Sequence, residues 1–172
     1  MQDSLFSFIM DCNGEVRVIK MAKELPDMAL KPIGVVRNKI KQTPKPGYDW
    51  RGIISDIVVD RSLSEALDNL DEFSHIIILY WMHRVATGQL PTKVHPMGKR
   101  ELPLVGLFAS RSPYRPNPIG KATVRLLERQ SNILKVEGLD AIDGTPVIDI
   151  KPYIPGYDSV TNARVPRWIT SL

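Results

Sequence analysis

The sequence predicts a mainly β protein, a small antiparallel β-barrel with one short amphipathic helix and an N-terminal β-hairpin. Short runs rich in Val and Ile recur along the chain, and Pro, Gly, Asp and Asn separate them. Only one segment has helical periodicity, which disfavours an alternating βαβ sheet. The expected strands of the main domain cover residues 33–37, 52–59, 73–82, 104–109, 122–127, 133–137 and 147–150.

The N-terminal segment carries the signal for the hairpin. Two β-like runs within residues 7–19 flank Asn13 and Gly14, and an Asn-Gly pair is the strongest short hairpin signal. Mixed polar residues and Pro26 then indicate a linker. We therefore expect an accessory hairpin and linker over residues 1–29, a barrel domain over 30–158 and a C-terminal tail over 159–172.

The segment 62–70 is the expected helix. Ser62 and Glu65 fit a capping box, and the apolar residues 63, 66, 67 and 70 have the spacing of one buried stripe. Its role is expected to be structural. The long segment 84–102 has no strand or helix signal, and in a compact domain such a loop is a functional lid, a binding loop or a disordered stretch.

Composition limits the class of protein. Of 172 residues, 43% are hydrophobic and 24% charged, as in an ordinary soluble domain. Cys12 is the single cysteine, and the N-terminus lacks the basic start and apolar stretch of a signal peptide, so a cytoplasmic location is expected. The longest apolar run, 76–82, is far too short to span a membrane.

The net charge is +4, and the positive residues gather in the central third of the chain. Such clustering indicates an anionic partner such as phosphate or RNA, although a solvated surface rich in Lys and Arg would have the same composition. The positive residues of this third are Lys93, Lys99, Arg100, Arg111, Arg115, Lys121, Arg125 and Arg129.

Metal, dinucleotide and hydrolase motifs are weak or missing in the sequence. His75 and His83 on one strand would lie roughly 26 Å apart, so with a single cysteine a metal site is not expected. His75 is either a hydrogen-bonded strand end or a catalyst. Ser110 and Ser112 lack a nucleophile elbow, yet a hydrolase acting through them or His75 stays open. There is no dinucleotide fingerprint and no Walker loop.

Residues 111–120 read RSPYRPNPIG and form a stiff, cationic corner. The three prolines fix φ and keep their neighbours extended, and Arg111 and Arg115 present planar donor groups suited to carboxylate or phosphate. The alternative is a proline-rich connector with surface arginines. Asp140 and Asp143 lie in an Asp-Gly turn whose carboxylates are suited to hydroxyl or ammonium groups, and residues 43–47 make a second proline-stiffened loop.

Three motifs together resemble the TsaA-like (TrmO) family of tRNA adenine N6-methyltransferases. They are GLFASRSPYRPNPIG (106–120), DGTPVIDIKPYIP (143–155) and EFSHIIILYWMH (72–83), within a similarity that covers roughly residues 30–158. The resemblance implies an antiparallel β-barrel that binds S-adenosylmethionine and acts as a homodimer, with the cofactor near the subunit interface. It also implies methyl transfer to N6 of threonylcarbamoyl-modified adenosine at tRNA position 37.

The resemblance further implies which residues form the site. Lys121 departs from the apolar residue common at that place in the family. The residues implied to bind the cofactor are Thr43, Pro44, Lys45, Ser74, His75, Arg111, Lys121, Asp143, Gly144 and Thr145. The RNA-binding candidates are Arg115, Lys99 and Arg100, while Arg164, Arg167 and Trp168 either meet RNA or pin the tail to the barrel. The candidates for accepting the proton released on methylation are Asp143, His75 and Tyr114.

Two other functions remain alternatives at this point. The first is a non-catalytic module that binds S-adenosylmethionine or RNA, or a methyltransferase with a different acceptor. The second is the hydrolase described above. The methyltransferase reading requires that the proline corner and the Asp-Gly turn share one cleft, within a subunit or between two subunits.

Overall fold

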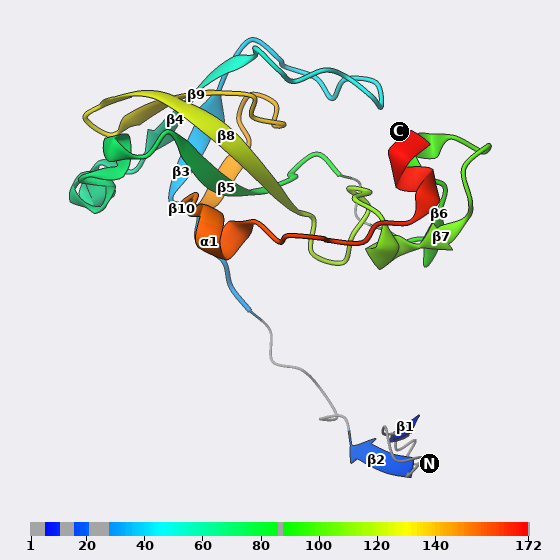
Figure 1. The fold of residues 1–172 in the computed structure, drawn as a ribbon. Coiled ribbons are helices and arrows are strands. Elements are labelled where there is room, and N and C mark those ends of the chain that lie inside the picture. The colour runs from blue at the N-terminus through cyan, green and yellow to red at the C-terminus, as the bar shows by residue number, and fades with distance from the viewer. Residues whose placement is uncertain (1–5, 11–15, 21–27, 86–87, 172) are drawn as a thin grey trace. The chain divides into compact units, whose positions relative to one another are not determined.

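The computed structural model describes residues 6–10, 16–20, 28–85 and 88–171. The chain divides into two compact units, residues 1–30 and 31–172, and each is described by itself (Figure 1). The three-part division expected from the sequence stays a prediction.

The first unit contains the expected hairpin strands. Strand β1 (Phe6–Met10) pairs antiparallel with β2 (Val16–Lys20). Phe6 lies opposite Lys20, and Met10 lies opposite Val16. The Asn13-Gly14 turn and Cys12 lie outside the described residues.

The second unit is a closed antiparallel barrel, as the sequence predicts. Six strands follow one another around it in the order β10-β3-β4-β9-β8-β5. Closure leaves no strand edge exposed to pair with another chain. The barrel strands are β3 (Gly34–Arg37), β4 (Ile54–Val59), β5 (His75–Trp81), β8 (Ile119–Gln130), β9 (Ile133–Glu137) and β10 (Pro146–Pro152).

The barrel interior is filled by β-branched and leucine side chains. Ile57, Ile76, Ile78 and Leu134 are fully buried there. Side chains alternate along a strand. Every second residue is therefore buried in β4, and over the first part of β8 every second residue is buried or partly buried. The remaining fully buried core residues are Val36, Val124, Val136, Leu139 and Val147.

The segment expected to be an amphipathic α-helix is helical but forms two 3-10 turns instead, η1 (Arg61–Leu67) and η2 (Leu70–Glu72). Asp60 caps the first turn by accepting from the Ser62 amide, so Ser62 is not the cap. Leu67 is buried, whereas Leu63 is 38% exposed. Asn69 has φ of 63°, which interrupts the helical path before a continuous apolar stripe can form.

The segment expected to be a loop over 84–102 and a strand over 104–109 also differs. A two-residue strand, β6 (Lys93–Val94), pairs with β7 (Val105–Gly106), and this small ribbon stands outside the barrel sheet. The expected second strand is short because only β6 is available to pair with it. Around the ribbon lie the 3-10 turns η3 (Pro96–Gly98) and η4 (Leu107–Ala109).

After the barrel the chain forms a short helix, α1 (Pro155–Asp158), and a final 3-10 turn, η5 (Arg167–Ser171). None of the helices in the described part of the chain has the length and apolar content needed to cross a bilayer.

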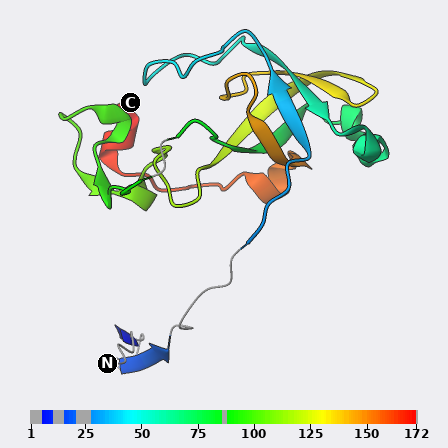
Figure 2. The ribbon, with the colours of Figure 1, turned by 180° about the vertical axis from the view of Figure 1, so that it is seen from behind.

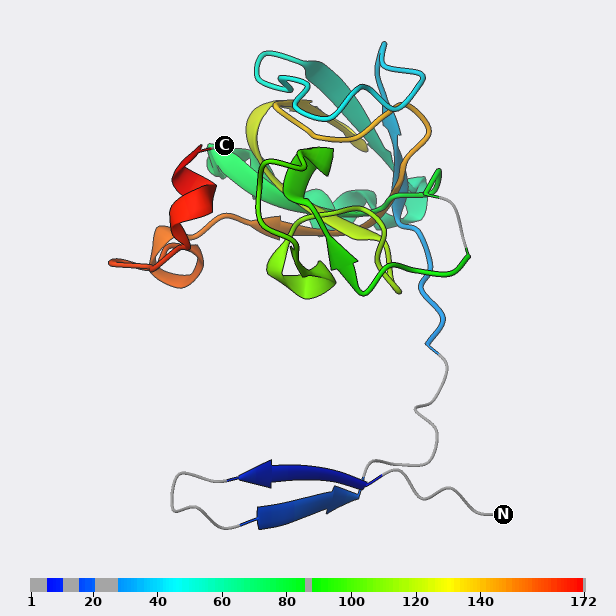
Figure 3. The ribbon, with the colours of Figure 1, turned by 90° about the vertical axis from the view of Figure 1, so that its right-hand side faces the viewer.

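Strand direction assigns each connection to one of the barrel's two ends. Strands β3, β5 and β9 finish where β4, β8 and β10 begin, so the loops 38–53, 82–118 and 138–145 all leave from one end, here called the mouth. The connections 60–74 and 131–132 lie at the other end, here called the far end. Figures 1 and 2 show the 82–118 loop extending beyond the mouth, and Figure 3 views the barrel from that side.

Candidate functional site

The mouth brings together three segments that are distant in the sequence and that motif analysis had singled out. The loop 38–53 contains Thr43 to Lys45, the loop 82–118 contains the proline corner, and the loop 138–145 contains the Asp-Gly turn. Antiparallel closure places all three at the same end, because each follows or precedes a strand that ends there. The hydrogen bonds between these loops define the candidate site.

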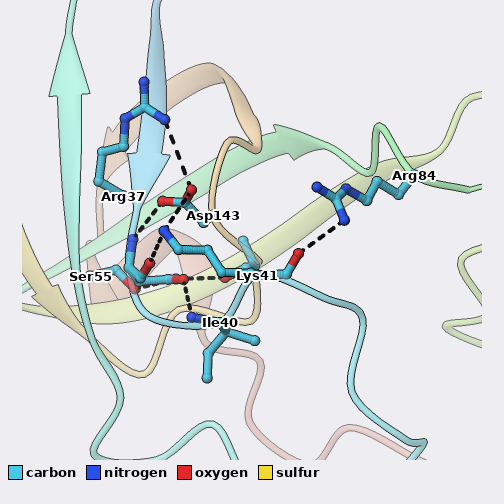
Figure 4. Close-up of polar contacts among 8 residues, drawn as sticks. Arg37, Ile40, Lys41, Ser55, Arg84 and Asp143 are labelled. Atoms are coloured by element: carbon cyan, nitrogen blue, oxygen red, sulfur yellow. Dashed lines mark hydrogen bonds and ion pairs between the residues drawn. The ribbon is translucent and has the colours of Figure 1, made fainter.

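Asp143 fastens the third loop to the first. Its Oδ1 accepts from the Asn38 amide at 3.0 Å, and its Oδ2 lies 2.9 Å from Lys41 Nζ and 4.0 Å from Arg37 Nη1 (Figure 4). The Asp143 amide also donates to the Ile40 carbonyl at 2.8 Å. The Lys41 ammonium and the Asn38 amide lower the pKa of Asp143. The carboxylate is therefore ionised and already engaged by the protein.

Asn38 and Arg84 extend the same network. The Asn38 side-chain amide donates to the buried Ser55 hydroxyl and to the Ala141 carbonyl, both at 2.9 Å. Arg84 Nη1 donates to the Lys41 carbonyl at 2.9 Å and so connects the start of the 82–118 loop (Figure 4). All three mouth loops are thus joined by hydrogen bonds, which restricts their movement relative to one another.

Gly144 and Thr145 continue the sheet beyond the strand ends. The Gly144 amide donates to the Val36 carbonyl at 2.8 Å, and the Val36 amide donates to the Thr145 carbonyl at 2.9 Å. Gly144 has φ of 78°, a conformation that side chains rarely adopt, so the turn needs glycine there. Thr145 is only 2% exposed, which leaves Gly144 as the more accessible of the two.

Arg111 and Asp140 both influence the ionisation of Tyr80. Tyr80 is 4% exposed near the end of β5, and burial raises its pKa, with Asp140 raising it further and Arg111 opposing. Partial loss of solvent around its carboxyl raises the pKa of Asp140, although the residue remains at the surface, and Arg111 again opposes. The proline corner and the acidic loop lie at the same end of the barrel within one subunit.

Gly120, the last residue of the proline corner, is required by this arrangement. It lies directly opposite Tyr80 in the β5–β8 pairing. A Cβ added to Gly120 would come within 2.2 Å of the Tyr80 ring. The ring therefore packs on the bare glycine backbone, and this contact helps to fix the position of the Tyr80 hydroxyl.

The proline corner itself is held by local contacts. Arg115 Nη1 donates to the Ser110 carbonyl at 2.9 Å, and its guanidinium carbon lies 5.4 Å from the centre of the Phe108 ring. The Ser110 hydroxyl donates to the Leu107 carbonyl at 2.8 Å. Neither Ser110 nor Ser112 approaches His75, which lies at the far end, so the serine–histidine pairing considered for a hydrolase is absent within the described chain.

The first loop offers exposed residues to the mouth. Thr43 and Lys45 are exposed and Pro44 is partly buried. Gly47 has φ of 83°, and a Cβ added there would lie 3.3 Å from Met97 Cε, so the 82–118 loop packs against this loop as well. The other cationic candidates in the 82–118 loop, Lys99 and Arg100, are exposed.

Three of the implied site residues lie away from the mouth loops. Ser74 and His75 are at the far end, where the Ser74 hydroxyl is 2.9 Å from His75 Nδ1 and the Tyr153 ring packs edge-on at 6.4 Å. They are about 20 Å from the mouth end of β5, at ~3.3 Å per residue. Lys121 donates to Thr123 Oγ1 at 2.9 Å along the exposed side of β8.

Several residues of the mouth had no signal in the sequence. Tyr80 reads as core within an apolar run, and Asn38 and Lys41 stand in an unremarkable polar stretch. Only the pairing of distant loops reveals their contacts. In the tail, Arg164 and Arg167 are exposed and Trp168 is partly buried. No group of three or more potential metal ligands occurs among the residues that the structure describes.

Known proteins resemble this chain over most of its length. A "Probable S-adenosyl-L-methionine-binding protein" of Archaeoglobus fulgidus is 43% identical over 138 residues, covering 79% of this chain and 37% of that protein. The "tRNA (adenine(37)-N6)-methyltransferase" of Escherichia coli is 40% identical over 141 residues, covering 76% and 60%. The crystal structure of TrmO from Pseudomonas aeruginosa superposes with a TM-score of 0.64 at 29% identity, covering 81% and 62%.

The chain therefore spans less than two thirds of the length of each of these three proteins. The model of the tRNA-methyltransferase O N-terminal domain matches residues 35–159, which include every barrel strand except the first residue of β3. The similarity thus covers the barrel together with all three mouth loops. By sequence and by fold, the chain belongs to the family of the tRNA-methyltransferase O N-terminal domain.

Proposed function

We propose that this protein is an S-adenosylmethionine-dependent tRNA methyltransferase that methylates N6 of threonylcarbamoyl-modified adenosine at position 37. The observation that carries the proposal is the convergence of three motif-bearing loops at the mouth, joined through Asp143, Asn38 and Arg84. The names of two relatives, a probable S-adenosylmethionine-binding protein and a tRNA methyltransferase, support the same chemistry.

The residues at the mouth fit the cofactor chemically. S-adenosylmethionine would supply a methyl group already activated by its sulfonium. Its carboxylate suits the guanidinium of Arg111, and its ammonium or ribose hydroxyls suit the Asp140 carboxylate and the backbone around Gly144. Lys45 and Thr43 are exposed on the opposing loop and complete the polar lining. Asp143 contributes by holding the 138–145 loop against the 38–53 loop.

The proton released from N6 needs an acceptor. Asp143 is a weak one, because its partners Lys41 and Asn38 stabilise the ionised form. Asp140 is better suited, since loss of solvent raises its pKa and makes it more basic. Tyr114 is exposed in the proline corner and remains a second candidate.

The division of the implied cofactor residues between the two ends supports the proposal of a homodimer. Arg111 and Asp143 are at the mouth, whereas Ser74 and His75 are at the far end of the same barrel. If all of them contact one cofactor molecule, the far-end residues must come from a second subunit. We therefore propose a shared site in which the mouth of one subunit faces the far end of its partner.

The RNA would reach the mouth through phosphate contacts. Arg115, Lys99 and Arg100 are the proposed contacts, and they lie on the loop that extends beyond the barrel. Affinity for tRNA should then decrease steeply as salt increases. A tRNA substrate supports the cytoplasm as the proposed location.

The test is methyl transfer from labelled S-adenosylmethionine to tRNA that carries or lacks the threonylcarbamoyl group. We expect label in N6-methylated threonylcarbamoyladenosine after digestion to nucleosides, and only from the modified tRNA. Arg111→Ala should weaken cofactor binding, measured by calorimetry without RNA. Label in neither tRNA would refute the assignment, and normal cofactor affinity in Arg111→Ala would remove Arg111 from the site.

A second candidate is a module that binds S-adenosylmethionine without transferring its methyl group to tRNA. The observation that favours it is the name of the Archaeoglobus fulgidus relative, which refers to binding and to no reaction. It predicts saturable cofactor binding in calorimetry together with no turnover in the transfer assay. The same pair of measurements therefore separates the two functions.

A further inference from the structure

Phe108 is the most exposed aromatic side chain in the mouth loops. It lies in η4 and is 75% exposed, which is unusual for a ring of this size. The ring is nevertheless held in place, because the Arg115 guanidinium lies over it at 5.4 Å. Arg115 is fixed in turn by its hydrogen bond to the Ser110 carbonyl at 2.9 Å. An aromatic surface is thus presented to solvent in a defined orientation.

The segment that carries this ring is cationic in sequence. No Asp or Glu occurs between residues 102 and 127, whereas Arg111, Arg115 and Lys121 all fall within this stretch. Tyr114, 50% exposed, adds a second aromatic ring to the same corner. Exposed aromatic rings beside arginines are the combination that binds single-stranded nucleic acid, by stacking on bases and pairing with phosphates.

A second copy of this face would be a poor partner for it. Bringing two such corners together would oppose arginine with arginine without an intervening carboxylate from this stretch, and like charges across an interface are unfavourable. A polyanion with exposed flat groups satisfies both properties of the surface. Charge complementarity therefore selects RNA as the occupant.

We propose that Phe108 and Arg115 form a stacking platform for an unpaired base of the tRNA anticodon loop, next to the adenosine that is methylated. The inference rests on the proposed tRNA function and adds a binding residue to it. Single-stranded loops are recognised largely by stacking of their unpaired bases on aromatic and guanidinium planes. Because Arg115 already orders the ring, little side-chain entropy is lost when a base stacks on it.

The test measures stacking separately from phosphate binding. The probe is an anticodon stem-loop RNA with 2-aminopurine beside the target adenosine, followed by fluorescence quenching and by anisotropy. Phe108→Ala should abolish the quenching and weaken binding at least roughly fivefold, the lower end for loss of one stacked base. Phe108→Trp should restore both. The dependence of affinity on salt should not change in either variant, since no phosphate contact is removed.

Leu104→Ala is the matched control, because Leu104 is an apolar side chain of the same loop, 55% exposed, and is not part of the platform. Its RNA affinity and quenching should equal those of the wild type. Arg115→Lys keeps the charge but not the planar group, so it should reduce quenching more than it alters the salt dependence.

Three results would overturn the platform. The first is unchanged quenching and affinity in Phe108→Ala. The second is dissociation of a dimer by Phe108→Ala, measured by light scattering, while RNA affinity stays normal. This result would assign the ring to self-association. The third is loss of cofactor affinity alone, which would assign it to the cofactor site. If the wild type methylates tRNA, these results reject only the platform; if it neither binds nor methylates RNA, the proposed function falls with it.

Discussion

The two ends of the barrel use similar interactions for different purposes. At the far end, Arg129 pairs with Asp68 at 2.8 Å and donates to the Ser64 carbonyl at 3.2 Å, which fastens one turn to the barrel wall. At the mouth, Asp143 and Arg84 connect loops that are far apart in the sequence. Both ends are polar, but the side-chain contacts of Arg129 join one turn to a strand, whereas those of Asp143 and Arg84 join three loops.

This difference shows how a small barrel separates stability from function. The core is filled mainly by alternating apolar residues of the strands, together with Leu67, Leu139 and Ala141 from the connections. The mouth loops can therefore carry exposed cations and aromatic side chains while the wall keeps them in position. Binding residues are expected at the mouth, and a role for His75 at the far end depends on the partner subunit proposed above.

The largest expected effect tests whether the two ends meet across subunits. His75→Ala and Arg111→Ala should each abolish most methyl transfer when every subunit carries the change. A dimer containing one chain of each kind, purified through two different tags, should regain about half of the wild-type activity, because one of its two shared sites is intact. A dimer of the double variant is the control and should be inactive. An inactive mixed dimer would show that the ends do not form a shared site.

The next effect tests the contact between the wall and the mouth. Gly120→Ala should lower the free energy of unfolding by about 3 kcal/mol, because the added Cβ would overlap the buried Tyr80 ring. Urea denaturation measures the loss. Gly106→Ala in the same motif is the matched control, since nothing lies within 4 Å of its Cβ, and it should change the free energy by less than about 0.5 kcal/mol. Equal effects of the two changes would contradict the packing described for Tyr80.

A smaller difference is expected between the ion pairs of the two ends. Asp143→Asn should lower the free energy of unfolding by about 1–3 kcal/mol, because two charge-assisted hydrogen bonds are weakened or lost. Asp68→Asn, at the far end, removes a pair whose carboxylate side chain is 64% exposed and should cost below about 1 kcal/mol. Only Asp143→Asn should also weaken cofactor binding. If calorimetry finds equal cofactor affinities, the mouth network does not position the site.

The smallest effect concerns pH. The pKa of Asp143 is lowered in the folded protein, so its network contributes its full stabilisation above the unfolded pKa near 3.8. This stabilisation is lost as the pH decreases through the pKa of the folded state. The difference in thermal stability between wild type and Asp143→Asn should therefore be constant from pH 7 to about 5 and shrink below about 4. Thermal denaturation of both proteins across this range measures it. A difference that grows on acidification would contradict the direction of this pKa shift.

The motif residues 106–120 show what could be predicted from sequence. Their prolines and arginines indicate a stiff cationic corner without any structure, because proline geometry and guanidinium charge are local properties. The β class followed in the same way from short Val- and Ile-rich runs. The helix over 62–70 was predicted as an α-helix because the spacing of its leucines matches that pattern, but only Leu67 is buried in the two 3-10 turns that form.

The sequence by itself determined the strand-forming segments, the turns and the chemical character of each loop, because these depend on neighbouring residues. Only the tertiary structure decided which loops meet. Barrel closure places the loops of Arg111 and Asp140 at the mouth and leaves His75 at the far end. The reason is that strand order and direction, which no local pattern encodes, determine the end of the barrel from which each loop leaves.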